Sequence, residues 1–379
     1  MAEAKDRLNV LMVTAQYFPH MGGTETHVHE IGRRLARRGI SITILTTMPH
    51  NLATSLPEEE VVEGIHIIRV RTWPPQGDYC IAPEMFAIIK QSAWDLVHCQ
   101  GCHTFVPPLA MLAAKAAKIP YIVTFHTGGH SSSFRNSIRG MQWKLLRPLL
   151  ADASTLIGVS RFEAEYFRNL LHLPAKQFAV IPNGAVLPAL PQTTSEIPAQ
   201  TLIVSVGRLE RYKGHQRLIT ALPKIHEWRS DVRLLILGVG PYEGALCELA
   251  HRVGVAEYVE IRSVPASDRQ GMAEILSQAS LVALLSEYEA HPVAVMEALT
   301  LRRPVLVADT SGLRELAEQK FVRAIPLNSS PEEVAQAIQQ QIEEPIIPPA
   351  HIVLPTWDDC ANRLEMVYNA LIRREQCAS

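Results

Sequence analysis

Two carboxylates with seven residues between them, Glu289 and Glu297, follow directly after the apolar segment LVALLS. We expect Glu289 in the loop before a helix and Glu297 inside that helix, roughly 7.5 Å along its axis at a rise of ~1.5 Å per residue. Carboxylates accept hydrogen bonds from hydroxyl groups, so the pair could hold hydroxyls on both sides of a bound phosphate. The spacing indicates a ligand with a sugar, a diphosphate and a ribose, although an isolated pair would also suit a helix surface and a positive helix end.

The expected start of that helix supplies an anion site between the two carboxylates. Pro292 fits the first helical position, where no backbone donor is needed. The amides of Val293, Ala294 and Val295 would then point unpaired toward an anion, and a phosphate would suit them. His291 adds a titratable group beside the same helix end.

Two cations converge on one loop in the segment GRLERYKGHQRLI. Gly207 ends a predicted strand, Arg208 follows it, and Lys213 precedes Gly214 and the next predicted helix. Arginine offers a planar fork and lysine a mobile point charge, a combination suited to the oxygens of a departing diphosphate. Taken alone, the two cations would also be typical of a solvated surface.

Glycine motifs follow two other predicted strands. In FPHMGGTETHV, Gly22 and Gly23 predict a tight turn before a helix capped by Thr24 or Thr26, and backbone could approach an anion there. An ordinary strand-to-helix turn fits the same residues equally well.

The second glycine motif, ILGVGPYEGAL, imitates a dinucleotide-binding fingerprint. Gly238, Gly240 and Gly244 form GxGxxxG with Glu260 further on, which leaves an NAD-dependent oxidoreductase as an alternative function. Pro241 more naturally opens a helix at its first position. The fingerprint also belongs to the first βαβ unit of a nucleotide domain, whereas this is the second, so we reject it as the leading interpretation.

The segment HCQGCH contains Cys99 and Cys102 flanked by His98 and His103, a pattern that could hold zinc. Structural zinc needs four ligands in a closed arrangement, and the sequence has no second such cluster. A strand-end loop is the favoured interpretation, and the six scattered cysteines are typical of reduced thiols.

Length and composition place the chain among ordinary globular proteins. With 379 residues, 47% hydrophobic and 20% charged, we expect two or three domains and no extended disorder. A net charge of −2 gives no reason to expect nucleic-acid binding. The N-terminus lacks a signal peptide and no run of 18 apolar residues exists, so we expect a cytoplasmic protein without a membrane span.

Apolar strands alternate with amphipathic stretches along the whole chain, which predicts an α/β protein with two doubly wound parallel sheets. The predicted organisation is a first domain over 1–182, a linker over 183–200, a second domain over 201–356, and a final helix over 357–379 that completes the first domain. In the second domain we predict helices at about 214–227, 241–254, 269–279 and 292–302. Ligands bind beyond the carboxyl ends of parallel strands, so we expect a cleft between the two domains.

Four motifs in series resemble those of the retaining GT-B glycosyltransferases, specifically glycosyltransferase family 4. They are GG after the first strand, GRLxxxKG, GxGP and EAHPVAVMEAL, and the resemblance spans almost the whole chain. It implies a GT-B fold and transfer of a hexose-type sugar from a UDP- or GDP-linked donor to a hydroxyl acceptor on a glycan, a glycolipid or a small molecule.

The resemblance also implies residue roles. Arg208 and Lys213 would hold the donor diphosphate, Glu297 the ribose hydroxyls and Glu289 the transferred sugar, while His126 would lie beside sugar and acceptor. The full set assigned to donor binding is Gly22, Gly23, Gly207, Arg208, Lys213, Gly238, Arg262, Ser263, Val264, Glu289, His291, Pro292, Val293, Ala294 and Glu297. Among these, Arg262, Ser263 and Val264 would frame the nucleobase. His126 would otherwise be a strand-end packing residue.

One position departs from the family pattern, which usually has Gly-Phe-Gly or Gly-Phe-Pro after the first glutamate. Ala290 stands at the first of these positions, and it would be strained if that position needs a positive φ. A catalytically silent scaffold that binds sugar nucleotides therefore remains a further alternative.

The charges at the predicted site also indicate how the leaving group is neutralised. Two cations and a helix start can neutralise the leaving diphosphate, so we predict metal-independent transfer with retention, in which Glu289 orients hydroxyls. Two basic amphipathic stretches could contact anionic lipid at the membrane inner face, or could be solvated faces. Their cations are Arg33, Arg34, Arg37, Arg38, Arg135, Arg139, Lys144 and Arg147.

Overall fold

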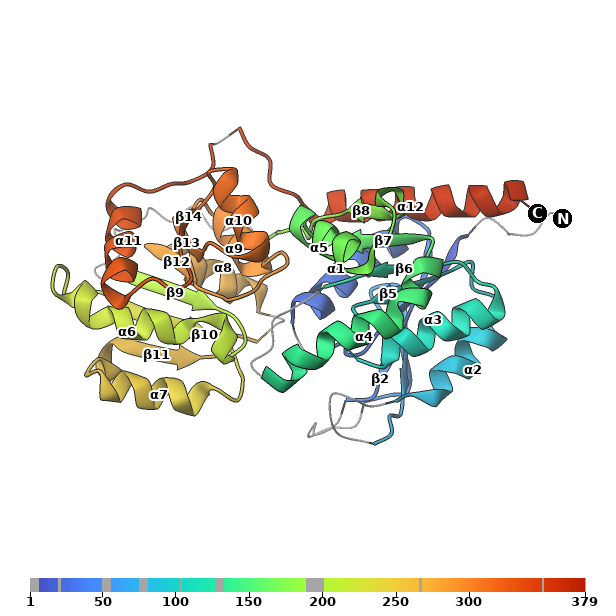
Figure 1. Ribbon diagram of the computed structural model, residues 1–379, viewed down its shortest axis with the longest axis horizontal. Coiled ribbons are helices and arrows are strands. Elements are labelled where there is room, and N and C mark those ends of the chain that lie inside the picture. The colour runs from blue at the N-terminus through green and yellow to red at the C-terminus, as the bar shows by residue number, and fades with distance from the viewer. Residues whose placement is uncertain are drawn as a thin grey trace. The chain divides into compact units, whose positions relative to one another are not determined.

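The structure is a computed structural model that describes residues 7–19, 22–49, 56–74, 81–102, 104–126, 133–188, 201–265, 268–349 and 351–378, with the main chain only at 133–139 and 374–378. The chain divides into two compact α/β units (Figure 1). Unit 1 comprises Met1–Thr127, Ser137–Gly184 and Pro355–Ser379, and unit 2 comprises Gly128–Asn136 and Ala185–Leu354.

Unit 1 is built on an eight-stranded sheet with the order β3-β4-β2-β1-β5-β6-β7-β8. Its strands are β1 (Asn9–Thr14), β2 (Ser41–Thr47), β3 (Glu59–Val62), β4 (Ile65–Val70), β5 (Leu96–Gln100), β6 (Tyr121–Thr124), β7 (Thr155–Gly158) and β8 (Phe178–Val180). Its helices are α1 (Gly23–Arg37), α2 (Pro83–Gln91), α3 (Val106–Ala117), α4 (Ser133–Asp152), α5 (Arg161–Leu171), the 3-10 turn η1 (Ala175–Gln177) and α12 (Trp357–Ala378). Every strand pair is parallel except β3 with β4.

Unit 2 holds a six-stranded, all-parallel sheet with the order β11-β10-β9-β12-β13-β14. Its strands are β9 (Leu202–Val206), β10 (Arg233–Leu237), β11 (Val259–Arg262), β12 (Leu281–Leu284), β13 (Val305–Ala308) and β14 (Arg323–Ile325). Its helices are α6 (His215–His226), α7 (Glu243–Arg252), α8 (Arg269–Gln278), α9 (Val293–Thr300), α10 (Ser311–Glu318) and α11 (Pro331–Glu343), with 3-10 turns η2 (Arg211–Lys213) and η3 (Ala256–Tyr258). The predicted fold class, α/β with two parallel sheets, is confirmed.

The central strands are apolar along their whole length because helices cover both faces of each sheet. In β5, β6, β12 and β13 every residue is buried. Two strand-order reversals follow from this winding. In unit 1, β1 lies between β2 and β5, and in unit 2, β9 lies between β10 and β12. Loops after such strands diverge to opposite faces of the sheet, which opens a crevice where ligands bind in doubly wound proteins.

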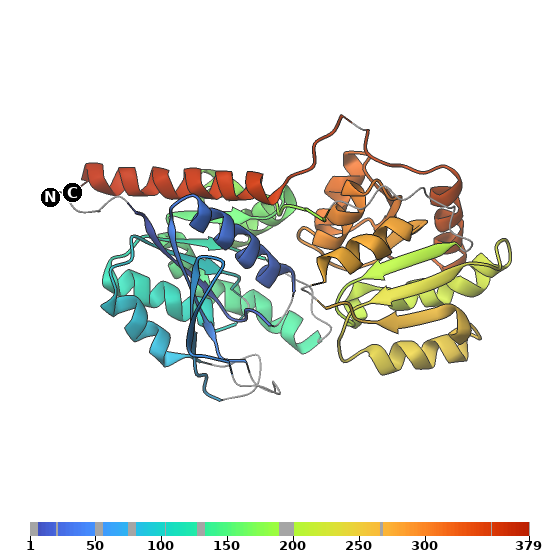
Figure 2. The same ribbon diagram turned by 180° about the vertical axis from the view of Figure 1, so that it is seen from behind.

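The last helix, α12, belongs to unit 1 and lies beside α1 (Figure 2). Trp357 and Tyr368 anchor it, with 2% and 0% of their surface exposed. The Tyr368 hydroxyl lies 2.7 Å from His98 Nδ1, and His98 Nε2 lies 2.8 Å from Thr124 Oγ1, so one buried imidazole joins α12 to β5 and β6. In the described part of the chain, no helix is both long enough and apolar enough to cross a bilayer.

Acid should destabilise the protein through His98. Burial lowers the pKa of this imidazole from 6.5 to about 3, so the folded state keeps it neutral while the unfolded state takes up a proton below pH 6.5. The contribution of His98 to the free energy of unfolding is therefore complete above pH 6.5. As the pH falls below 6.5, protonation of the unfolded state lowers the free energy of unfolding by ~1.4 kcal/mol per pH unit, or about 2 kcal/mol at pH 5. Calorimetry across this range, with an NMR titration of His98, measures the effect. A His98 ring that titrates near pH 6.5 in the folded protein would contradict it.

Candidate functional site

The charged residues predicted in unit 2 meet at the carboxyl ends of β9 and β12, which are neighbours in the sheet. Arg208 follows β9, and the turn Arg211–Lys213 leads through Gly214 into α6. Gly214 has a φ of 79°, and a Cβ on it would lie 2.0 Å from the carbonyl oxygen of Leu285. Only glycine permits this backbone contact, which brings the Lys213 loop against the loop after β12.

Lys213 and Glu289 form a largely buried ion pair, with 15% and 11% of their side chains exposed. The Lys213 ammonium donates to Glu289 Oε1 at 2.6 Å, and Ser286 Oγ donates to the same oxygen at 2.8 Å. Burial disfavours the charged ammonium, but the Glu289 carboxylate outweighs it, so the pKa of Lys213 is raised. The site therefore holds a permanent cation against a carboxylate.

Residues at the start of α10 hold Glu289 by its backbone. The Glu289 amide donates to Ser311 Oγ at 2.8 Å, and the Glu289 carbonyl accepts from the Gly312 amide at 2.9 Å. Thr310 Oγ1 donates to the Ser286 carbonyl at 3.0 Å. Ser311 has a φ of 43°, which for a non-glycine residue costs on the order of 1–3 kcal/mol. Strain maintained beside a buried ion pair is typical of functional loops.

The helix α9 begins at Val293, so Pro292 is its N-cap and not its first residue, contrary to our prediction. Pro292 has a ψ of 113°, which is extended, and the helical conformation begins one residue later. The first helical hydrogen bond runs from the Met296 amide to the Pro292 carbonyl, at 3.2 Å. The amides of Val293, Ala294 and Val295 thus lie outside the helical ladder, and the Pro292 side chain has no acceptor to cap them. Anion binding there stays a prediction.

Ala290 does not carry the strain that the sequence suggested for it. Its backbone φ is not positive, and the left-handed residue close to this loop is Ser311, the first residue of α10. Ala290 is buried at 7% exposure, and its carbonyl packs against Gly312. Next to it, burial lowers the pKa of His291 to about 4, so its imidazole is neutral at pH 7.

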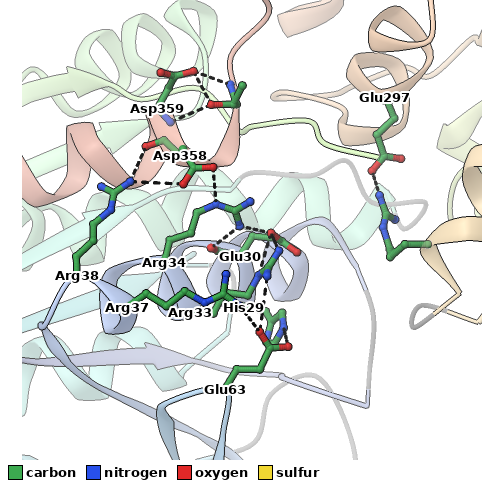
Figure 3. A network of polar contacts seen from close by, with 12 residues as sticks. His29, Glu30, Arg33, Arg34, Arg37, Arg38, Glu63, Glu297, Asp358 and Asp359 are labelled. Atoms are coloured by element: carbon green, nitrogen blue, oxygen red, sulfur yellow. Dashed lines mark hydrogen bonds and ion pairs between the residues drawn. The ribbon is translucent and has the colours of Figure 1, made fainter. Parts of the chain in front are cut away.

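The second glutamate of the motif is also paired with a cation. Glu297 lies inside α9 with 4% of its side chain exposed, and Arg269, the first residue of α8, donates to its Oε1 (Figure 3). Arg269 was not among the predicted site residues. Only the tertiary contact between the start of α8 and Glu297 of α9 reveals it, because 28 positions separate the two side chains.

A buried histidine, His215, contacts the backbone of the Arg208 loop. His215 Nδ1 lies 2.9 Å from Ser205 Oγ, and His215 Nε2 lies 3.3 Å from the Arg208 carbonyl oxygen. Burial lowers the pKa of His215 to about 4, so the ring is neutral at pH 7. The Arg208 guanidinium donates to the Tyr212 hydroxyl at 3.1 Å. No sequence pattern indicated His215 or Ser205 beyond their positions near the strand end.

The glycine motif after β10 has a packing explanation. A Cβ on Gly238 would lie 1.9 Å from the Gly207 carbonyl oxygen, so the two strand-end loops touch through their backbones. The helix α7 begins at Glu243, two residues after Pro241, so Pro241 does not open it as predicted. Gly238 thus serves the contact between β9 and β10, which a dinucleotide is not needed to explain.

The residues assigned to the nucleobase, Arg262, Ser263 and Val264, end β11 and follow it. The Arg262 guanidinium lies 2.7 Å from Glu260 Oε1, with 44% and 62% of the two side chains exposed. A contact with a base stays a prediction for all three residues.

In unit 1 the glycine loop leads into α1 with a different cap from the one predicted. Gly22 is the N-cap, in an extended conformation, and α1 begins at Gly23, so Thr24 and Thr26 lie within the first turn. The Thr26 amide donates to the Gly22 carbonyl at 3.0 Å. A Cβ on Gly23 would meet nothing within 4 Å, which leaves that position open.

His126 lies beyond β6 with a φ of 48°, another left-handed non-glycine residue. Its Nε2 lies 2.8 Å from Gln100 Oε1 at the end of β5. Its ring packs edge-on against buried His27, with 4.4 Å between centroids. Sequence reasoning missed Gln100 and His27, since 26 positions separate Gln100 from His126.

The HCQGCH segment is built into the core of unit 1. Cys99 and Cys102 are 0% and 1% exposed, and burial raises the pKa of both thiols. Both ring nitrogens of His98 are engaged by Tyr368 and Thr124. His103 lies outside the described residues. Among the described residues, no group of three or more His, Cys, Asp or Glu side chains could hold a metal ion.

The basic face of α1 is occupied by ion pairs within unit 1 (Figure 3). Its three arginines and the C-cap residue Arg38 each reach a carboxylate, and the partners are Glu30, Glu63, Asp358 and Glu365. These pairs join α1 to α12 and to Glu63, so the charge predicted for a lipid surface is largely neutralised here. Arg135 and Arg139 of the second basic stretch have side chains outside the described ones.

Two family models together match most of the chain. The model for Glycosyltransferase Family 4 matches residues 21–187, and the model for Glycosyl transferases group 1 matches residues 191–352. The chain belongs to glycosyltransferase family 4. This glycosyltransferase carries the GT-B fold that the sequence motifs implied.

Individual relatives agree with this assignment. The glycosyltransferase is 25% identical to D-inositol 3-phosphate glycosyltransferase of Nocardiopsis dassonvillei, over 92% of this chain and 90% of that protein. Sucrose-phosphate synthase from Thermosynechococcus elongatus shares the fold, with a TM-score of 0.74 and 19% identity, over 98% of this chain and 100% of that one. HepE from Anabaena, solved with UDP-glucose, has a TM-score of 0.70 and 18% identity over 98% and 100%.

Proposed function

We propose that this glycosyltransferase takes a hexose-type sugar from a UDP- or GDP-linked donor and transfers it, with retention, to a hydroxyl acceptor on a glycan, a glycolipid or a small molecule. One observation carries the proposal: at the strand-order reversal of unit 2, Lys213 of the loop after β9 forms a buried pair with Glu289 of the loop that leads to the start of α9. A cation and amide donors suit a diphosphate, and a carboxylate suits the hydroxyls of a saccharide.

In the proposed reaction, the donor diphosphate binds to Arg208, Lys213 and the amides at the start of α9. The Lys213 ammonium, which donates to Glu289 in the structure, turns partly to the phosphate oxygens. Glu289 then accepts hydrogen bonds from hydroxyls of the sugar, and Glu297 accepts hydrogen bonds from hydroxyls of the ribose. As the bond between the anomeric carbon and the phosphate oxygen breaks, the acceptor oxygen forms its bond on the same face, and the departing phosphate oxygen takes the acceptor proton.

Neutralisation of the leaving group by protein groups supports transfer without a metal ion. Lys213 remains protonated at neutral pH, since Glu289 raises its pKa against the effect of burial. Arg208 and a helix N-terminus add positive potential at the same strand ends. Turnover in the presence of a chelator is the direct measurement, and its abolition by chelation with recovery on adding a divalent cation would contradict this part of the proposal.

The nature of the donor rests on relatives as well as on the site. HepE from Anabaena was solved with UDP-glucose, and a mannosyltransferase of Komagataeibacter xylinus that is 24% identical over 83% of this chain is named for GDP-mannose. Both donors are nucleoside diphosphate sugars. The shared diphosphate and ribose are the parts that Lys213, Arg208 and Glu297 would contact.

A thermal-shift series with UDP-, GDP- and ADP-sugars tests the proposal and identifies the base. A donor present at ~100 times its dissociation constant stabilises the folded protein by roughly 2.7 kcal/mol, which raises the melting temperature measurably. We expect one base to give the largest shift and NAD to give none. A shift with NAD and none with any nucleotide sugar would overturn the assignment of the donor.

A further inference from the structure

The carboxamide of Gln100 lies where β5 ends, beside His126, the histidine that the family resemblance places next to the sugar and acceptor. Gln100 is 2% exposed and pairs with Thr124 across β5 and β6, and His126 lies two residues further along the chain. Its Oε1 lies 2.8 Å from His126 Nε2. Since the carbonyl oxygen of a neutral amide can only accept, this geometry gives the proton to Nε2 of the imidazole.

The His126 ring is constrained from two other directions. Its backbone has a φ of 48°, which few side-chain-bearing residues adopt. Its ring forms a T-shaped contact with His27, which is 1% exposed and whose Nδ1 lies 2.8 Å from Asn183 Oδ1. Packing alone fixes where the ring lies, but it does not decide which nitrogen carries the proton. Gln100 contacts one of these nitrogens, Nε2, through an oxygen that only accepts hydrogen bonds.

We propose that Gln100 is a positioning residue, which holds His126 as the neutral tautomer protonated at Nε2 so that Nδ1 meets a saccharide hydroxyl as an acceptor. This inference rests on the proposed function for its chemistry, and on the place beside sugar and acceptor that the family resemblance implies for His126.

The choice of an amide at this position has a chemical reason. A glutamate in place of Gln100 would also accept from Nε2, but its charge would raise the pKa of His126 and favour the imidazolium, which has no acceptor nitrogen. A neutral amide fixes the tautomer without adding a proton. Within the described part of the chain, Gln100 Nε2 has no hydrogen-bond partner, so the contact with His126 is what orients the carboxamide.

The first measurement uses the ligand-free protein and does not depend on activity. Nitrogen-15 NMR of the imidazoles, with His126 assigned by comparison with His126→Gln, should show Nε2 protonated and Nδ1 unprotonated at neutral pH. In Gln100→Met the two tautomers should mix. In Gln100→Glu the Nε2 proton should remain while Nδ1 also becomes protonated, with a pKa for His126 higher than in the natural protein.

The second measurement is turnover with the donor that the thermal-shift series selects. Gln100→Met should lower kcat by about 10²-fold with little change in donor KM, because a misoriented group costs rate more than ground-state binding. Gln100→Glu should be slow at neutral pH and recover as the pH rises and the ring loses its extra proton. Gln142→Leu is the matched control, since Gln142 also makes one hydrogen bond to a neighbour, the Cys102 carbonyl, in unit 1.

The outcomes separate this inference from the proposed function. An unchanged His126 tautomer in Gln100→Met overturns the inference and leaves sugar transfer untouched. A changed tautomer with natural kcat overturns the positioning role. If the natural protein transfers no sugar yet its His126 spectrum changes as expected in Gln100→Met, the proposed function fails while the control of the tautomer stands.

Discussion

Replacing Lys213 with methionine should lower kcat/KM for sugar transfer by about 10²–10³-fold, the typical cost of losing one charged donor that stabilises a leaving group. The change removes the ammonium and keeps much of the apolar volume. Its effect should appear mainly in kcat, because the charge on the diphosphate grows as the glycosidic bond breaks. Steady-state kinetics with the cognate donor measures it.

A loss of stability must be separated from this loss of catalysis. Lys213→Met leaves the Glu289 carboxylate buried without its cation, which destabilises by up to about 3–5 kcal/mol in a buried pair. The double variant Lys213→Met, Glu289→Gln removes both charges and should recover most of the melting temperature without recovering transfer. Lys224→Met is the matched control, because Lys224 is an exposed lysine of α6 that pairs with Glu227. Natural turnover in Lys213→Met would remove the basis of the proposed mechanism.

Replacing Glu297 with alanine should weaken nucleoside diphosphate binding by about 10- to 100-fold, since a hydrogen bond to a charged group contributes ~1.5–3 kcal/mol. Glu297 is proposed to bind a ribose hydroxyl, so Glu297→Ala should not weaken the binding of a nucleoside diphosphate that lacks that hydroxyl. We expect the natural protein to bind a nucleoside diphosphate more tightly than its 2′-deoxy or 3′-deoxy counterpart. Glu297→Ala should bind these forms about equally, and calorimetric titration measures each affinity.

The control for this change lies on the neighbouring helix. Glu274 is an exposed carboxylate of α8, and Glu274→Ala should keep both the affinity and the preference for ribose. Arg269 loses its carboxylate partner in Glu297→Ala, so Arg269→Met, Glu297→Ala shows whether the stranded guanidinium changes the result. If Glu297→Ala still prefers the ribose form as strongly as the natural protein does, Glu297 does not contact the ribose.

The strands at the centre of each sheet could be predicted from the sequence, as could the edge strand β11, whereas the edge strands β3, β8 and β14 could not. In β1, β5 and β12, nearly every residue is buried, and such apolar runs leave a clear pattern. The strands β3, β8 and β14, which the apolar pattern did not predict, have mostly exposed or half-buried residues. An edge strand packs on fewer neighbours, so its sequence carries less of the signal.

Helix ends were predicted less accurately than the helices themselves. Pro292 and Pro241 were both placed at first helical positions, yet their helices begin one and two residues later. Thr24 and Thr26 were expected as caps, whereas Gly22 takes that place. A proline fits the first turn of a helix and also the extended residue before it, so residue type alone leaves the start undecided.

The partners within the site also needed the tertiary structure. Lys213 and Glu289 are 76 positions apart, Arg269 and Glu297 are 28 apart, and Gln100 and His126 are 26 apart. The two residues of each pair belong to different strands, helices or loops. Which of them meet depends on strand order, and that order places β12 beside β9 through long-range packing.

By itself, the sequence determined the α/β alternation, the two sheets, the order of the motifs and the family that they indicate, because all of these depend on local periodicity and short spacings. Only the tertiary structure decided that both glutamates of the motif lie buried against cations, that Ser311 and not Ala290 takes the left-handed backbone, and that Gln100 faces His126. Such contacts join residues distant along the chain, and burial and charge act through space.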